Sequence, residues 1–67
     1  MSVAKVTEIT ASSAKSFDDA IQTGISRAAK TLDNVSSAWI QDHEVAIADG
    51  KITEYKVRMK VTFILKD

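Results

Sequence analysis

The sequence predicts an α+β subunit in the order strand, helix, strand, strand, in which a three-stranded antiparallel sheet wraps around one helix. Three observations predict it: a stretch of helical period, two long stretches of alternating polarity, and an Asp-Gly pair between those two. The chain has 67 residues and no internal repeat or low-complexity segment. We therefore expect residues 1–67 to form a single domain.

The first strand and the helix follow from local composition. Residues 3–10 are rich in β-branched side chains and lead into a small polar cluster, which is typical of a strand that enters a loop. Ser16, with Asp19 three residues later, resembles a helix N-cap. Asp33 and Asn34 supply a stop signal. Between these signals, apolar and small residues recur at helical spacing: Phe17, Ala20, Ile21, Gly24, Ile25, Ala28, Ala29 and Leu32.

Residues 37–48 and 52–65 are expected to form a long hairpin, because Asp49-Gly50 suits the two positive φ angles of a type I′ turn. Alternation in the last strand assigns one set of side chains to the helix side: Tyr55, Val57, Met59, Val61, Phe63 and Leu65. A two-residue turn predicts the cross-strand pairs Ala48–Lys51, Val45–Glu54, His43–Lys56, Gln41–Arg58 and Trp39–Lys60. This register places Trp39 and Val45 on the sheet face turned away from the helix.

The composition favours self-association over other partners. Nine basic and nine acidic residues give a net charge of zero, which disfavours nucleic acid or an anionic membrane as a partner. No signal-peptide pattern or apolar run of membrane-spanning length is present, so we expect a cytoplasmic location. A chain this short builds a marginal core, and without cysteine it has no disulfide to support that core. We therefore expect a homo-oligomer.

No catalytic motif is present, and we expect no enzymatic activity. His43 lies between Asp42 and Glu44, but neighbours on a strand point to opposite faces. Asp18 and Asp19 favour the positive end of the helix, although symmetry-related copies could collect a cation. Any metal ligands stay unassigned. The basic row Lys56, Arg58 and Lys60 forms either a solvated or ion-paired face, or it faces a cavity in the assembly and holds anionic ligands or the carboxylates of neighbouring subunits.

Taken together, these elements resemble the dodecins, a family of small flavin-binding proteins. The segments that carry the resemblance are Lys5-Val6-Thr7-Glu8-Ile9, Ala11-Ser12-Ser13, Ser26-Arg27-Ala28-Ala29-Lys30-Thr31-Leu32, Asp49-Gly50 and the run from Tyr55 to Phe63. The resemblance implies a hollow homododecamer that stores or sequesters flavins such as riboflavin or FMN.

The resemblance also implies a flavin site whose residues are altered here. In flavin-binding dodecins a tryptophan early in the second strand stacks on the isoalloxazine ring, and a glutamine in the last strand hydrogen-bonds the polar edge of that ring. Ser37 stands at the usual tryptophan position, with Trp39 two residues later, and Lys56 replaces the glutamine. The candidate cofactor-binding residues are Trp39, Lys56, Ser37 and Gln41. The alternative is a dodecin-like shell that holds another small ligand or a metal ion, or is purely structural.

Overall fold

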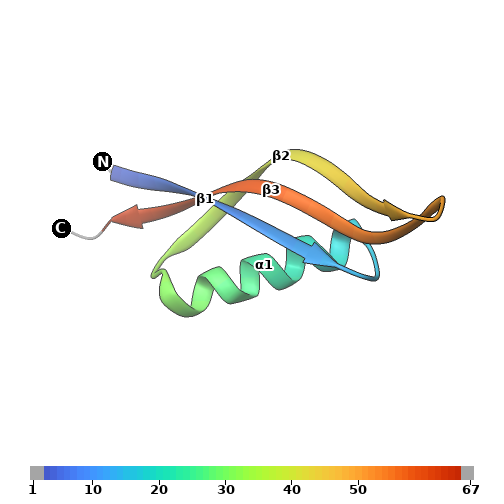
Figure 1. Ribbon diagram of the computed structural model, residues 1–67. Helices are drawn as coiled ribbons and strands as arrows, with labels where there is room; N and C mark the ends of the chain where they lie inside the picture. Colours follow the sequence, from blue (N-terminus) through green and yellow to red (C-terminus); the bar gives the residue numbers. More distant parts are fainter. Residues whose placement is uncertain (1–2, 66–67) are drawn as a thin grey trace.

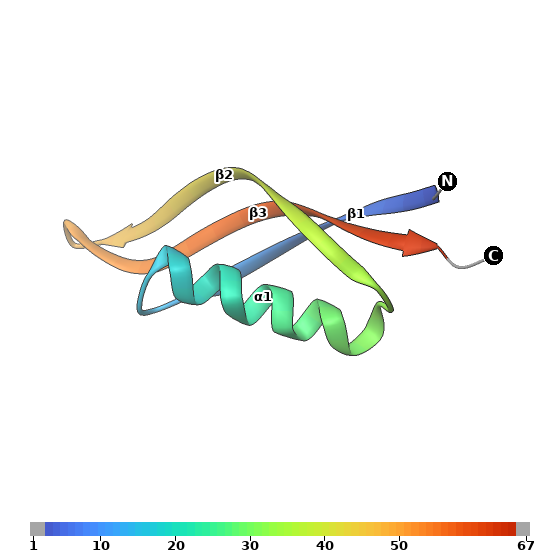
Figure 2. The same ribbon diagram turned by 180° about the vertical axis from the view of Figure 1, so that it is seen from behind.

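A computed structural model describes residues 3–65 and confirms the β-α-β-β order. The elements are β1 (Val3–Ser13), α1 (Phe17–Thr31), β2 (Val35–Ala48) and β3 (Lys51–Leu65). The three strands form one sheet in the order β1-β3-β2, and β3 pairs antiparallel with both neighbours. The twisted sheet arches over α1, which lies against one face only (Figures 1 and 2). Among the described residues no helix has the length and apolarity that a membrane crossing requires.

The predicted helix signals act as expected. The Ser16 hydroxyl accepts a hydrogen bond from the Asp19 backbone N–H at 3.0 Å, as an N-cap does. The helix ends at Thr31, just before the predicted stop signal at Asp33 and Asn34. Leu32 is the C-cap and donates its N–H to the Ala28 carbonyl at 2.9 Å. Asn34 then adopts φ 62°, a left-handed conformation that turns the chain toward β2.

The hairpin turn and the two ends of the predicted register are confirmed. Asp49 and Gly50 have φ angles of 53° and 74°, as a type I′ turn requires. Ala48 pairs with Lys51, and Trp39 pairs with Lys60. Between these ends the predicted pairs are wrong by one residue. They are Val45–Tyr55, His43–Val57 and Asp42–Arg58 in place of Val45–Glu54, His43–Lys56 and Gln41–Arg58.

Two β-bulges explain the displaced segment. Near the turn, Ile47 pairs with Ile52 and Ala46 with Glu54, so Thr53 is an extra residue on β3. The Thr53 hydroxyl donates to the Ala46 carbonyl at 3.2 Å and so holds this bulge in place. Further along, Gln41 is an extra residue on β2. The second bulge cancels the first, which restores the predicted pairing at Trp39.

The core is small and lies between α1 and the centre of β3. Its fully enclosed side chains are Ala20, Val57, Met59 and Val61. Gly24 lets α1 approach the sheet closely, because a Cβ at this position would lie 2.6 Å from the Met59 methyl and 2.9 Å from the Ala11 Cβ. Around the enclosed residues stands a ring of half-buried apolar side chains: Ile9, Ala11, Phe17, Ile21, Ile25, Leu32, Val35, Ala38 and Ile40.

The sheet extends beyond the helix at both of its ends (Figure 1). The molecule is 52 Å long, whereas a helix of 15 residues spans about 22 Å. Large apolar side chains are consequently exposed toward the ends of the sheet, namely Val3, Ile47, Ile52 and Leu65. Val6 and Trp39 are exposed on the face turned away from α1, where they pair with Thr62 and Lys60. Ile47 and Ile52 form one cross-strand pair beside the hairpin turn, 64% and 52% exposed. Apolar surface of this extent is typical of a subunit that contacts other subunits.

Candidate functional site

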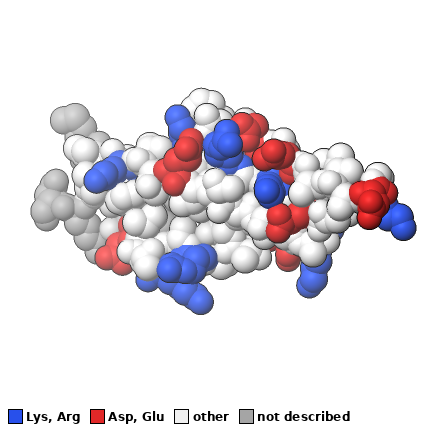
Figure 3. Space-filling model, in the orientation of Figure 1, with Lys and Arg blue, Asp and Glu red and all other residues white. Residues whose placement is uncertain are grey.

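The face of the sheet turned away from α1 carries most of the polar side chains on β3, and we call it the outer face. Its basic row, Lys56, Arg58 and Lys60, runs down the middle strand of the sheet. Cross-strand pairing places β2 and β1 residues on either side of each of these side chains: Glu44 and Ser12 beside Lys56, Asp42 and Thr10 beside Arg58, and Trp39 and Glu8 beside Lys60. Figure 3 shows acidic and basic side chains alternating over the strands.

Trp39 lies on the outer face, as the sequence predicted. Its side chain is 67% exposed, which leaves the indole open to solvent or to another molecule. The Lys60 ammonium lies over the indole, 5.8 Å from the ring centroid. This distance is within the range of a cation–π interaction, which stabilises exposed pairs by about 0.5–1 kcal/mol. An exposed indole beside an ammonium group provides a stacking surface and a positive charge together.

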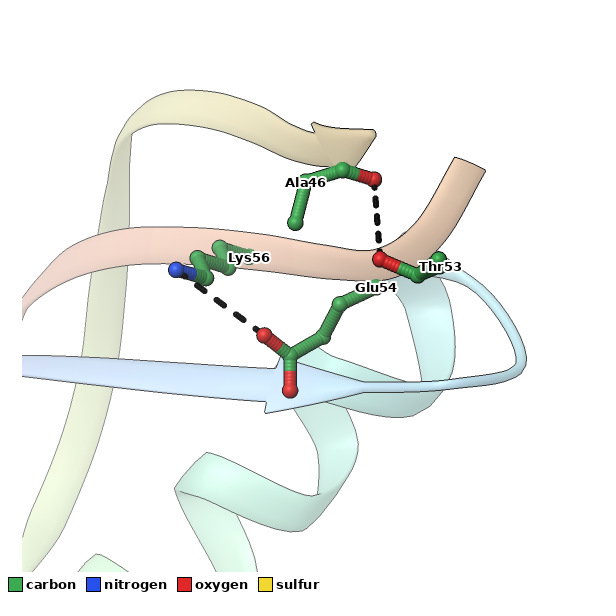
Figure 4. Close-up of polar contacts among 4 residues, drawn as sticks. All are labelled: Ala46, Thr53, Glu54 and Lys56. Carbon is green, nitrogen blue, oxygen red and sulfur yellow. Dashed lines mark hydrogen bonds and ion pairs between the residues drawn. The ribbon is translucent and has the colours of Figure 1, made fainter. Parts of the chain in front are cut away.

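Lys56 lies nearer the hairpin turn, in the environment that Figure 4 shows. Its ammonium is 3.9 Å from a carboxylate oxygen of Glu54, and both side chains are about 40% exposed. An ion pair that long and that exposed contributes little to stability. The Lys56 ammonium is therefore able to exchange Glu54 for another acceptor.

The structure does not bring the predicted site residues together within one chain. Trp39 pairs with Lys60, which stands four residues from Lys56 along β3, or about 13 Å at 3.3 Å per residue. Ser37 pairs with Thr62, six residues from Lys56 and thus about 20 Å away. Gln41 is a bulged residue of β2 and is exposed. These four residues are spread along the sheet and do not surround one point.

Two hollows among residues 3–65 lie elsewhere. One of about 560 Å³ is bounded by β1 and α1, with Ile9, Ala11, Gly24 and Ala28 in its lining. A second, of about 300 Å³, adjoins Asn34 at the end of the helix. Neither includes a predicted site residue. Within the described part of the chain, no three His, Asp or Glu side chains are grouped as a metal site requires.

His43 and Asp19 have structural contacts. The imidazole packs edge-on against the Phe17 ring, 4.6 Å between centroids, and Phe17 in turn meets Tyr55 at 5.1 Å. His43 therefore faces the helix, whereas we predicted that it lies beside Lys56. The Asp19 carboxylate accepts a hydrogen bond from the Ser13 hydroxyl at 2.6 Å. Sequence reasoning did not single out either contact, because each depends on how distant segments pack.

The geometry defines a class of protein: a β-α-β-β subunit whose outer face carries both acidic and basic side chains and an exposed indole. The Dodecin family model matches residues 3–66. The chain belongs to the dodecin family. None of the curated proteins matches it.

Solved dodecin structures are similar to this one over nearly their whole length. The dodecin from Streptomyces davaonensis is 35% identical, with a TM-score of 0.93 and coverage of 98% of this chain and 97% of that one. A point mutant of the Thermus thermophilus dodecin is 28% identical, with a TM-score of 0.93 and full coverage of both chains. A third relative is the calcium dodecin of Mycobacterium tuberculosis, described as calcium-chelating. It is 28% identical, with a TM-score of 0.82 and coverage of 96% and 91%.

Dodecins are generally flavin-binding proteins that form multimeric assemblies and bind or store their ligands without turning them over, and the calcium dodecin shows that one relative binds calcium. The fold of the present chain is that of the family. That Ser37 replaces a flavin-stacking tryptophan and Lys56 a glutamine stays a prediction from the resemblance.

Proposed function

We propose that this chain assembles with copies of itself into a closed homododecamer that binds a flavin, riboflavin or FMN, and stores or sequesters it without catalysing a reaction. The observation that carries the proposal is the exposed Trp39 indole on the outer face of a dodecin subunit. A flat aromatic surface that is 67% exposed is suited to stack on a planar ring system.

The flavin site is proposed to form between copies. One chain separates Trp39 from Lys56 by about 13 Å, so its own Lys56 does not lie beside a ring stacked on its own Trp39. In a symmetric pair of subunits the same patch occurs twice, so that Lys56 of one copy can meet the ring that Trp39 of the other copy holds. The exposed apolar residues at the ends of the sheet, among them Ile47 and Leu65, supply surface for such contacts.

Lys56 changes how the ring edge is recognised. A glutamine side chain both donates and accepts, whereas a lysine ammonium donates only. Lys56 can therefore donate to a flavin carbonyl but cannot accept from the ring N–H. The proposed site keeps the stacking and loses part of the hydrogen-bonding pattern.

The direct test is a titration of riboflavin with the purified protein, followed by the quenching of flavin fluorescence, together with an absorbance spectrum of the protein as isolated. Stacking on Trp39 is expected to quench the flavin. Unchanged fluorescence at high protein concentration, with no flavin bands in the spectrum, would refute flavin binding.

Replacing Lys56 by glutamine is expected to raise the affinity for riboflavin by about fivefold, because the amide restores an acceptor for the ring N–H and a typical hydrogen bond is worth about 1 kcal/mol. The same titration measures the change. Lys51→Gln removes an equivalent charge beside the hairpin turn and serves as the control. Equal affinities in the Lys56→Gln variant and the unmodified protein would show that Lys56 does not contact the ring edge.

The alternative is a dodecin shell that holds a metal ion or another ligand in place of flavin. The likeness to the calcium dodecin supports it, although no metal-ligand group is present within residues 3–65 of one chain. Calorimetric titration with Ca²⁺ tests it: heat of binding in a protein that does not quench riboflavin would favour the alternative.

A further inference from the structure

The end of the β2–β3 hairpin extends past α1 (Figure 1), and we call residues 46–54 the hairpin tip. β1 ends opposite Tyr55, so beyond this residue the sheet has two strands only. Ile47 follows Val45 by two residues and therefore lies on the helix side of the sheet, together with its partner Ile52. These two isoleucines are 64% and 52% exposed. The tip thus presents an apolar pair that α1 of the same chain does not cover.

The larger of the two hollows, about 560 Å³ in volume, is a groove between β1 and α1. Its lining includes the apolar side chains of Ile9, Ala11 and Leu32 and the hydroxyl of Thr23. Arg27 is the one charged residue of the lining, and it makes no ion pair closer than 4.0 Å within residues 3–65. The groove therefore offers an apolar surface with an exposed cation whose charge is not matched by a carboxylate of the described chain.

The hairpin tip is complementary to this groove in charge as well as in polarity. The Asp49 carboxylate, at the turn, also has no ion pair in the described part of the chain. Lys51 lies on the opposite face of the hairpin from the two isoleucines. The smaller hollow has Asp33 in its lining, and that carboxylate would repel Asp49. Charge thus favours the groove with Arg27 over the smaller hollow.

One chain cannot fill its own groove. Ser12, the last groove residue of β1, pairs with Lys56, and the tip extends from there away from the groove. We propose that the hairpin tip of one copy docks in the groove of the next, with Asp49 against Arg27. The inference rests on the proposed assembly of copies, not on flavin binding, and assigns the two surfaces that meet. Because these surfaces differ, the contact is head-to-tail, and such contacts close into rings.

The Ile47→Thr/Ile52→Thr double variant removes the apolar pair and keeps β-branched side chains in both strands. We expect the concentration at which the assembly dissociates to rise at least about tenfold, since burial of one isoleucine side chain is worth that factor or more. Light scattering over a dilution series measures this concentration. Lys51→Gln, on the opposite face of the same hairpin end, is expected to leave it unchanged.

The Thr23→Glu variant changes the groove and not the tip. Thr23 is exposed on α1, and glutamate is the better helix former, so the fold should persist. The new carboxylate stands four residues before Arg27, pairs with it and competes with Asp49. We expect the assembly to weaken by a similar factor. Gln22→Glu adds the same charge at an exposed helix position outside the groove lining and serves as the control.

Mixing the two variants tests the head-to-tail geometry. The double isoleucine variant keeps an intact groove and the Thr23→Glu variant keeps an intact tip, so the mixture retains one good contact for each pair of chains. We expect its mean mass to exceed that of either variant alone, with circular dichroism showing that both are folded. An assembly of unchanged mass in both folded variants, or a mixture no larger than its components, would overturn this contact while self-assembly stands. An unmodified protein that stays monomeric would overturn the assembly and the contact with it.

Discussion

The Trp39→Ala variant is expected to bind riboflavin and FMN about 10- to 100-fold more weakly than the unmodified protein. The reason is that stacking of a planar ring on an aromatic side chain is worth about 1–3 kcal/mol in alanine replacements. Trp39 is 67% exposed and is not part of the enclosed core, so its removal should leave the fold intact. The loss is therefore expected in binding and not in stability.

Fluorescence titration measures this loss, and circular dichroism with light scattering checks that the variant is folded and assembled. Trp39→Phe keeps a smaller aromatic ring and is expected to lie between alanine and tryptophan in affinity. Affinities that do not depend on the aromatic ring at position 39 would show that flavin binds elsewhere on the subunit.

The Met59→Ala variant is expected to lose about 2–5 kcal/mol of the free energy of unfolding, because it leaves a cavity at the most enclosed part of the core. Met59 is fully buried on the central strand, with its methyl against Gly24 of the helix. A chain of 67 residues has a total stability of about 3–10 kcal/mol by ordinary per-residue values. This single replacement therefore removes a large fraction of the stability of the subunit.

Urea unfolding followed by circular dichroism measures the change, at one fixed protein concentration because association contributes to the apparent stability. Met59→Leu keeps nearly the same volume and is expected to cost less than about 1.5 kcal/mol. If alanine and leucine gave the same small loss, the contact between β3 and α1 would not be the centre of the core.

Most of the fold could be predicted because its signals are local. The cap at Ser16, the stop at Asn34 and the turn at Asp49-Gly50 each depend on a few neighbouring residues, and all three are confirmed. The first strand is longer than predicted and continues to Ser13, because its last residues pair with β3. Pairing partners far away in the sequence, such as Tyr55 for Ser13, leave no local signal.

The register shows where local reasoning fails. A bulge at Thr53 shifts the pairing by one residue, and a bulge at Gln41 shifts it back. Because the two shifts cancel, the prediction that Trp39 lies on the outer face is correct. Between them, His43 and Val45 face the helix side and not the outer face, opposite Val57 and Tyr55. A threonine and a glutamine within alternating strands carry no pattern that marks a bulge.

The candidate site was predictable in its residue types and not in its arrangement. Trp39 and the basic row could be assigned to one face by alternation alone. The separation of Trp39 from Lys56 depends on the actual register. Because of this separation, one chain presents only part of the proposed flavin site.

The central claim is that this subunit completes its surfaces, and its flavin site, only in a closed assembly of copies. Multi-angle light scattering of the purified protein at micromolar concentration tests it most directly. We expect one species of about 88 kDa, twelve times the 7.3 kDa mass of the chain. A folded, stable species of 7.3 kDa under the same conditions would contradict the claim.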